Sequence, residues 1–131
     1  EVDPDNSQLI FTARMVNDDM PSKIAARIRK TLCDIPSPHI VAIGAAYKVN
    51  AEDTRESPAT EVVRLLRSDG YWVDHYDPLV EGMQFPSTLV EACTGADCLI
   101  LLVEHDLVMK EFGVRLAEIE EAMRHPMILR F

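Results

Sequence analysis

The stretch that decides the fold is IVAIGAAYKVNAEDTRESP, residues 40–58. It opens with an apolar run, residues 40–43, typical of a strand buried on both faces of a parallel sheet. It closes with Ser57 as a helix N-cap and Pro58 at the first helical position. The polar loop between them has about ten residues, where such loops usually have about two to six. Because α/β sheets hold ligands at the carboxyl ends of their strands, the loop predicts a phosphate or nucleotide site without the usual glycine fingerprint.

Three residues of this stretch are candidates for the site. Gly44 allows the backbone to pack closely at the end of the strand. Lys48 is either a compact cation for a diphosphate or a sugar carboxylate, or a solvated loop lysine. Arg55 either forks onto a phosphate or pairs with Asp53 or Glu56 and braces the loop, and the neighbouring carboxylates favour the brace.

The chain as a whole alternates strands and helices, which predicts an α/β, Rossmann-like parallel sheet of about four strands flanked by helices. We expect these strands at residues 40–43, 71–76, 98–103 and 127–131. Numbered in that order, they should form a sheet of order 2-1-3-4. The ligand crevice would then be lined by residues 47–57 and by Glu104 and His105.

The first third of the chain is predicted to be helical. One helix is expected over residues 9–16 and a second from Pro21, with a proline-rich extended link at residues 35–38. We therefore divide the chain into a helical connector, 1–37, and a ligand-binding domain, 38–131.

Near the other end, Gly113 is expected to separate a helical turn at 106–112 from a helix at 114–124. The chain starts without Met and stops inside an apolar run, so we expect a domain truncated at its C-terminus, a piece of a longer protein.

Composition excludes several classes of function. The net charge of −9 argues against nucleic-acid binding, since no basic stripe is available to release counterions. No apolar run reaches the roughly 18 residues that a membrane span needs, and no secretory leader is present. The three cysteines have no metal-like spacing and indicate reduced, cytoplasmic thiols, so no metal site is predicted.

Two further ionisable side chains follow predicted strands. His105, between Glu104 and Asp106, could be an acid-base group, but a loop histidine near the ligand is the favoured interpretation. Asp77 follows the second strand, where a dinucleotide fold places its ribose-binding acid. Because the first loop lacks Gly-x-Gly-x-x-Gly, we interpret Asp77 as a strand terminator and reject NAD binding by this domain.

Three motifs carry a specific resemblance. Residues 44–48 (GAAYK), 53–58 (DTRESP) and 76–78 (YDP) occur in the order found in the C-terminal UDP-binding domain of the UDP-glucose/UDP-N-acetylmannosamine dehydrogenases, which the chain resembles. Residues 13–21 (ARMVNDDMP) are similar to part of the family's central connecting helix, a dimerisation region. The form of this segment favours the UDP-N-acetylmannosamine branch.

The resemblance implies roles for individual residues. Tyr47 and Lys48 match the pair that contacts the bound UDP-sugar, with Arg55 beside them. Asp53 and Arg55 would shape the Lys48 loop, and Arg14 would reach a substrate in the neighbouring subunit of a homodimer.

The resemblance also implies an NAD-dependent parent enzyme of polysaccharide biosynthesis, which oxidises the C6 alcohol of a UDP-sugar on a catalytic cysteine. This chain contains neither a glycine-rich dinucleotide loop nor a cysteine in a glycine-rich context. We therefore expect it to bind the UDP moiety without catalysis, with NAD held by the missing N-terminal domain. The alternative is a stand-alone nucleotide-binding or subunit-interaction module without chemistry.

Overall fold

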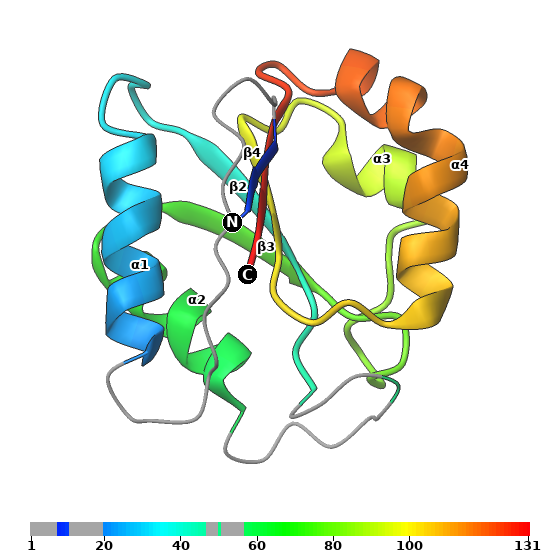
Figure 1. Ribbon diagram of the computed structural model, residues 1–131, viewed down its shortest axis with the longest axis horizontal. Helices are drawn as coiled ribbons and strands as arrows, with labels where there is room; N and C mark the ends of the chain where they lie inside the picture. Colours follow the sequence, from blue (N-terminus) through cyan, green and yellow to red (C-terminus); the bar gives the residue numbers. More distant parts are fainter. Residues whose placement is uncertain (1–7, 11–19, 47–49, 51–56) are drawn as a thin grey trace.

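A five-stranded parallel sheet forms the centre of the computed structural model, which describes residues 8–10, 20–46, 50 and 57–131 (Figure 1). The strand order is β1-β5-β4-β2-β3. The strands are β1 (Gln8–Ile10), β2 (His39–Ile43), β3 (Trp72–Tyr76), β4 (Cys98–Leu101) and β5 (Met127–Arg130). Four of them, β3-β2-β4-β5, confirm the predicted order 2-1-3-4.

Helices cover both faces of the sheet (Figure 1). Helices α1 (Met20–Thr31) and α2 (Pro58–Ser68) share a hydrophobic core with one face. Helices α3 (Leu89–Cys93) and α4 (Asp106–Ala122) share a second core with the other face. This arrangement follows from the parallel strands, because each crossover must return over one face of the sheet.

The apolar run of β2 serves both cores in alternation. Ile40 and Ala42 belong to the core under α1 and α2, whereas Val41 and Ile43 belong to the core under α3 and α4. All four side chains are fully buried. The central strand therefore needs an uninterrupted apolar sequence rather than an alternating one.

The prediction of a helix over residues 9–16 is wrong for its first residues. Residues 8–10 form β1, which pairs in parallel with β5, so that Leu9 lies opposite Leu129. The open edge of β5 offers unpaired backbone groups, and pairing there outweighs a local helical periodicity. Residues 11–16 lie outside the described residues.

The predicted break at Gly113 is also wrong, since α4 runs through it without interruption. An exposed glycine inside a helix costs about 1 kcal/mol relative to alanine. Burial of Val108, Phe112 and Ile119 against the sheet outweighs this cost, because a buried apolar side chain of this size contributes about 1.5–3 kcal/mol.

Candidate functional site

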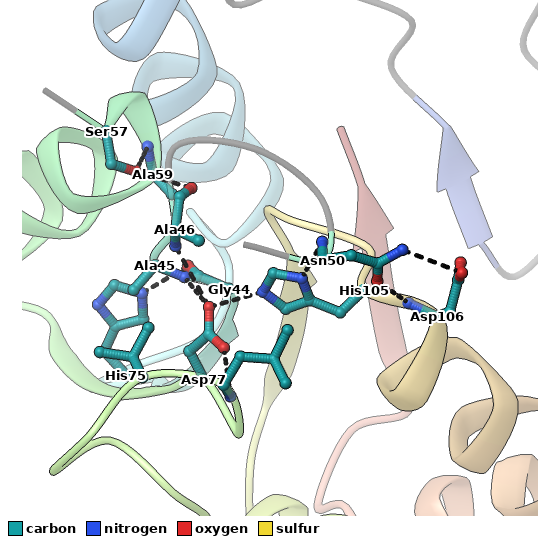
Figure 2. A network of polar contacts seen from close by, with 12 residues as sticks. Gly44, Ala45, Ala46, Asn50, Ser57, Ala59, His75, Asp77, His105 and Asp106 are labelled. Atoms are coloured by element: carbon teal, nitrogen blue, oxygen red, sulfur yellow. Dashed lines mark hydrogen bonds and ion pairs between the residues drawn. The ribbon is translucent and has the colours of Figure 1, made fainter. Parts of the chain in front are cut away.

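The described part of the candidate site lies at the carboxyl edge of the sheet, where β2, β3 and β4 end side by side. The residues that follow these strands form one network of polar contacts (Figure 2). Its members come from five places in the sequence: residues 44–46, Asn50, residues 57–59, residues 75–79 and residues 105–106.

Gly44 is required at the end of β2 for two reasons. Its backbone has φ +109°, a conformation that residues with a side chain rarely adopt. A Cβ at this position would lie 2.4 Å from the backbone nitrogen of Val103. The Gly44 N–H donates to the Tyr76 carbonyl at 2.8 Å, and its carbonyl accepts from His75 Nε2 at 2.7 Å. The predicted close packing of Gly44 is therefore confirmed.

Asp77 is a fully buried carboxylate at the centre of Figure 2. Its Oδ2 accepts from the backbone N–H of Ala45 at 2.8 Å and of Ala46 at 3.2 Å. Its Oδ1 accepts from the N–H of Leu79 at 2.9 Å. Burial raises the pKa of Asp77, but these N–H donors and His105 outweigh burial and hold the pKa below its usual value. Asp77 therefore stays ionised and joins the backbone after β2 to the turn after β3.

His105 is fully buried and has a partner on each ring nitrogen. Nε2 lies 2.8 Å from Asp77 Oδ2, and Nδ1 lies 2.7 Å from the backbone nitrogen of Asn50. A backbone N–H can only donate, so Nδ1 must be an unprotonated acceptor, and the ring proton belongs on Nε2. The network thus assigns His105 as the neutral Nε2–H tautomer.

Asn50 caps the start of α4, although it lies in a distant part of the sequence. Its Oδ1 accepts from the N–H of Asp106 at 3.0 Å, and its Nδ2 donates to Asp106 Oδ2 at 3.0 Å. The N-cap of α4, His105, makes no capping bond with its own side chain. Asn50 has φ +61°, a left-handed conformation that asparagine tolerates better than most residues.

Ser57 fixes the other end of the segment that follows β2. As the N-cap of α2, it accepts from the N–H of Ala59 at 3.2 Å, as predicted, with Pro58 in the first turn. Its hydroxyl also donates to the Ala46 carbonyl at 3.2 Å. Ala46 and Ser57 are therefore held together, although 11 positions separate them in the sequence.

Glu104 is engaged with Arg130 at the end of β5. The Arg130 guanidinium donates from Nε at 3.0 Å and from Nη2 at 2.6 Å, one bond to each carboxylate oxygen. This bidentate pairing offsets the negative charge of Glu104 at the edge of the sheet.

Several predicted site residues lie outside the described residues: Arg14, Tyr47, Lys48, Asp53 and Arg55. Among the residues that are described, sequence reasoning missed Asn50 and the linking role of Asp77. A signal existed for each: Asp77 follows a predicted strand and precedes proline, and asparagine is one of the few residues suited to a left-handed turn. Within the described ranges, no group of three or more His, Cys, Asp or Glu side chains could hold a metal, and no helix is long and apolar enough to cross a membrane.

Comparison with known proteins shows to which family the chain belongs. Residues 41–130 match the UDP binding domain of the UDP-glucose/GDP-mannose dehydrogenase family. The UDP-N-acetyl-D-mannosamine dehydrogenase of Methanococcus maripaludis is 40% identical over 105 residues, covering 78% of this chain and 25% of that protein. The enzyme of that name from Methanocaldococcus jannaschii is 42% identical over 103 residues, covering 77% of this chain and 24% of that protein. The chain spans about a quarter of the length of these curated relatives.

Solved structures agree with the sequence comparison. The UDP-D-ManNAc dehydrogenase of Pyrococcus horikoshii superimposes with a TM-score of 0.74 at 31% identity, covering 87% of this chain and 27% of that one. The UDP-N-acetyl-mannosamine dehydrogenase of Staphylococcus aureus has the same fold, with a TM-score of 0.72 at 23% identity, covering 87% of this chain and 27% of that one. The chain therefore belongs to the UDP-glucose/GDP-mannose dehydrogenase family and corresponds to its UDP binding domain.

Proposed function

We propose that this chain binds the UDP moiety of a sugar nucleotide for an NAD-dependent 6-dehydrogenase of the UDP-N-acetylmannosamine or UDP-glucose type. Tyr47, Lys48 and Arg55 are the proposed contacts, with Asp53 shaping their segment. The observation that carries the proposal is the anchored edge around them: Ala46 is bound to Asp77 and to Ser57, and Asn50 is bound to α4. A polar segment tied at its ends and in between is suited to hold a flexible diphosphate.

The charge at this edge supports an anionic ligand despite the acidic composition. Each described carboxylate of the edge has a partner: Asp77 has backbone N–H groups and His105, Glu104 has Arg130, and Asp106 has Asn50. The start of α2 lies at the same edge and favours negative charge there. The described carboxylates therefore place little uncompensated negative charge beside the segment between Ala46 and Ser57.

In the proposed enzyme this domain binds and does not catalyse. Burial raises the pKa of the Cys93 and Cys98 thiols to about 12, so neither is a thiolate nucleophile at neutral pH. NAD and the catalytic cysteine are assigned to the rest of the enzyme, so that the sugar end meets the cysteine when the UDP end is fixed here. We further propose that residues 1–37 connect this domain, 38–131, to the remainder of a cytoplasmic homodimer, in which Arg14 reaches the neighbouring subunit's substrate.

Titration of the chain with UDP by calorimetry tests the binding role. Lys48→Ala should weaken binding about tenfold, because a hydrogen bond to a charged group contributes about 1.5–3 kcal/mol. Lys30→Ala is the matched control, since Lys30 is an exposed lysine at the end of α1, next to the opposite edge of the sheet. Equal UDP affinity in Lys48→Ala and the wild type would show that the assignment of Lys48 is wrong.

A second measurement separates the binding domain from a catalytic one. Supplied with NAD and UDP-N-acetylmannosamine or UDP-glucose, the chain should give no increase in absorbance from reduced cofactor. Sustained turnover would contradict the domain assignment. The alternative, a binding or subunit-interaction module without chemistry, is tested by reading the gene upstream of Glu1 for a Gly-x-Gly dinucleotide motif and a catalytic cysteine motif.

A further inference from the structure

We propose that Asn50 and His105 are positioning residues for the proposed UDP site, and that UDP affinity therefore depends on His105 remaining neutral. The inference rests on the proposed function and describes what controls the UDP affinity of that same site. It is carried by the contacts of Figure 2, in which His105 joins Asn50 to Asp77.

The first step concerns where Asn50 is held. Three hydrogen bonds, of 2.7 to 3.0 Å, join Asn50 to His105 and Asp106 at the start of α4. Asn50 lies two positions after Lys48 in the sequence. Holding Asn50 in place before the ligand binds reduces the entropy that the proposed site loses on binding.

The second step concerns how His105 can act. Its side chain is fully buried, so it cannot itself contact a bound nucleotide. Both ring nitrogens are engaged, one with Asp77 and one with Asn50. The influence of His105 on a ligand must therefore pass through Asn50.

The third step concerns the proton. A proton added to Nδ1 would point at the Asn50 N–H, and two donors cannot share a 2.7 Å contact. The bond from Nε2 to Asp77 would survive, because the charged imidazole still donates there. Protonation of His105 should thus release Asn50 while leaving the Asp77 side of the network intact.

The charged groups around His105 come from several elements. Asp77 follows β3, and Asp106 opens α4. Glu104 is paired with Arg130 of β5, and His75 of β3 is bound to the Gly44 carbonyl. Because acid favours the protonated form of an imidazole, the loss of affinity is expected as pH falls.

Two substitutions at His105 separate its two contacts. In His105→Gln the longer amide reaches the place of Nε2 and can donate to Asp77, but nothing accepts from Asn50. In His105→Asn the shorter amide oxygen takes the place of Nδ1 and can accept from Asn50, while the bond to Asp77 is lost. At neutral pH we expect His105→Gln to weaken UDP binding about tenfold and His105→Asn to restore most of that loss.

The pH profile provides a measurement that a purely structural role would not move. UDP itself gains a proton near pH 6. The quantity compared is therefore the ratio of the wild-type affinity to the variant's affinity, both measured at the same pH. This ratio should change with pH for both variants, because neither carries an imidazole at position 105. Hydrogen exchange of the Asn50 amide should also be faster in His105→Gln than in the wild type.

Asn50→Gly keeps the left-handed backbone and the N–H while it removes both bonds to Asp106, which keeps the test usable if a His105 variant fails to fold. It should weaken UDP binding about threefold to tenfold. The inference is overturned if His105→Gln and Asn50→Gly both bind UDP as the wild type does, or if the affinity ratios are independent of pH. A wild-type chain that binds no UDP overturns the proposed function and this inference together. An unaffected Lys48→Ala variant beside a weakened His105→Gln variant overturns the Lys48 assignment alone.

Discussion

Replacement of Gly44 by alanine should be one of the most destabilising single-methyl additions available in the described part of this chain. The new Cβ would lie 2.4 Å from the Val103 nitrogen and 2.8 Å from its Cα, both of them backbone atoms of the segment after β4. The flexible end of a side chain could move aside, but the backbone of Val103, whose N–H is bonded to the Ile43 carbonyl, cannot move as easily. The backbone at Gly44 also has φ +109°.

The expected cost is the sum of two terms. Holding alanine in this backbone conformation costs about 1–3 kcal/mol. Forcing an extra methyl group into a closely packed site usually costs about 1–3 kcal/mol more. The sum, about 2–6 kcal/mol, is a large part of the roughly 5–15 kcal/mol by which a domain is stable.

Urea unfolding of three glycine variants tests this reasoning. With a dependence of about 2 kcal/mol per molar urea, the middle of the usual range, Gly44→Ala should lower the midpoint by about 1–3 M. Gly70→Ala shares a positive φ, +93°, but its Cβ would meet no atom within 4 Å, so it isolates the backbone term. Gly113→Ala lies in a helix with open space around it and should stabilise the chain by about 0.5–1 kcal/mol. If Gly44→Ala costs no more than Gly70→Ala, contact with Val103 is not the reason for glycine.

Three further outcomes are expected. Asp77→Asn should lose about 1–3 kcal/mol of unfolding free energy in urea at neutral pH. Because the pKa of Asp77 in the folded chain lies below the ordinary value of 3.8, the advantage of the wild type is present above pH 3.8 and disappears as pH falls through the folded pKa. A difference between the two proteins that stays constant down to acid pH would contradict this expectation. Ser57→Ala should lose about 1 kcal/mol in thermal unfolding through its cap on α2, and an unchanged midpoint would contradict the cap. A thiol reagent should label exposed Cys33 quickly but the buried Cys93 and Cys98, with pKa values of about 12, only on unfolding; fast labelling of all three would refute their burial.

Local patterns determined most of the fold in advance. Four strands in the observed order were predicted, with the apolar runs of β2 and β4 as the clearest signals. The helices α1 and α2 were predicted from the apolar face of α1 and from the Ser57-Pro58 start of α2. The strands and helices themselves were predictable because each depends on residues within one or two helical turns, whereas the strand order was predicted from the usual arrangement of βαβ units. The predictions for residues 9–16 and Gly113 failed because pairing with β5 and burial along α4 are decided by distant partners.

The network at the carboxyl edge was decided by tertiary structure alone. His105 and Asn50 are separated by 55 positions, and His105 and Asp77 by 28. No local pattern relates such residues; they meet because parallel pairing of β3, β2 and β4 brings the ends of these strands to one edge. The sequence by itself determined that a long polar segment follows β2 at a ligand-binding edge. Only the assembled sheet decided that Asn50 of this segment is bound to a buried histidine and, through it, to a buried carboxylate, because hydrogen bonds depend on positions that chain folding alone establishes.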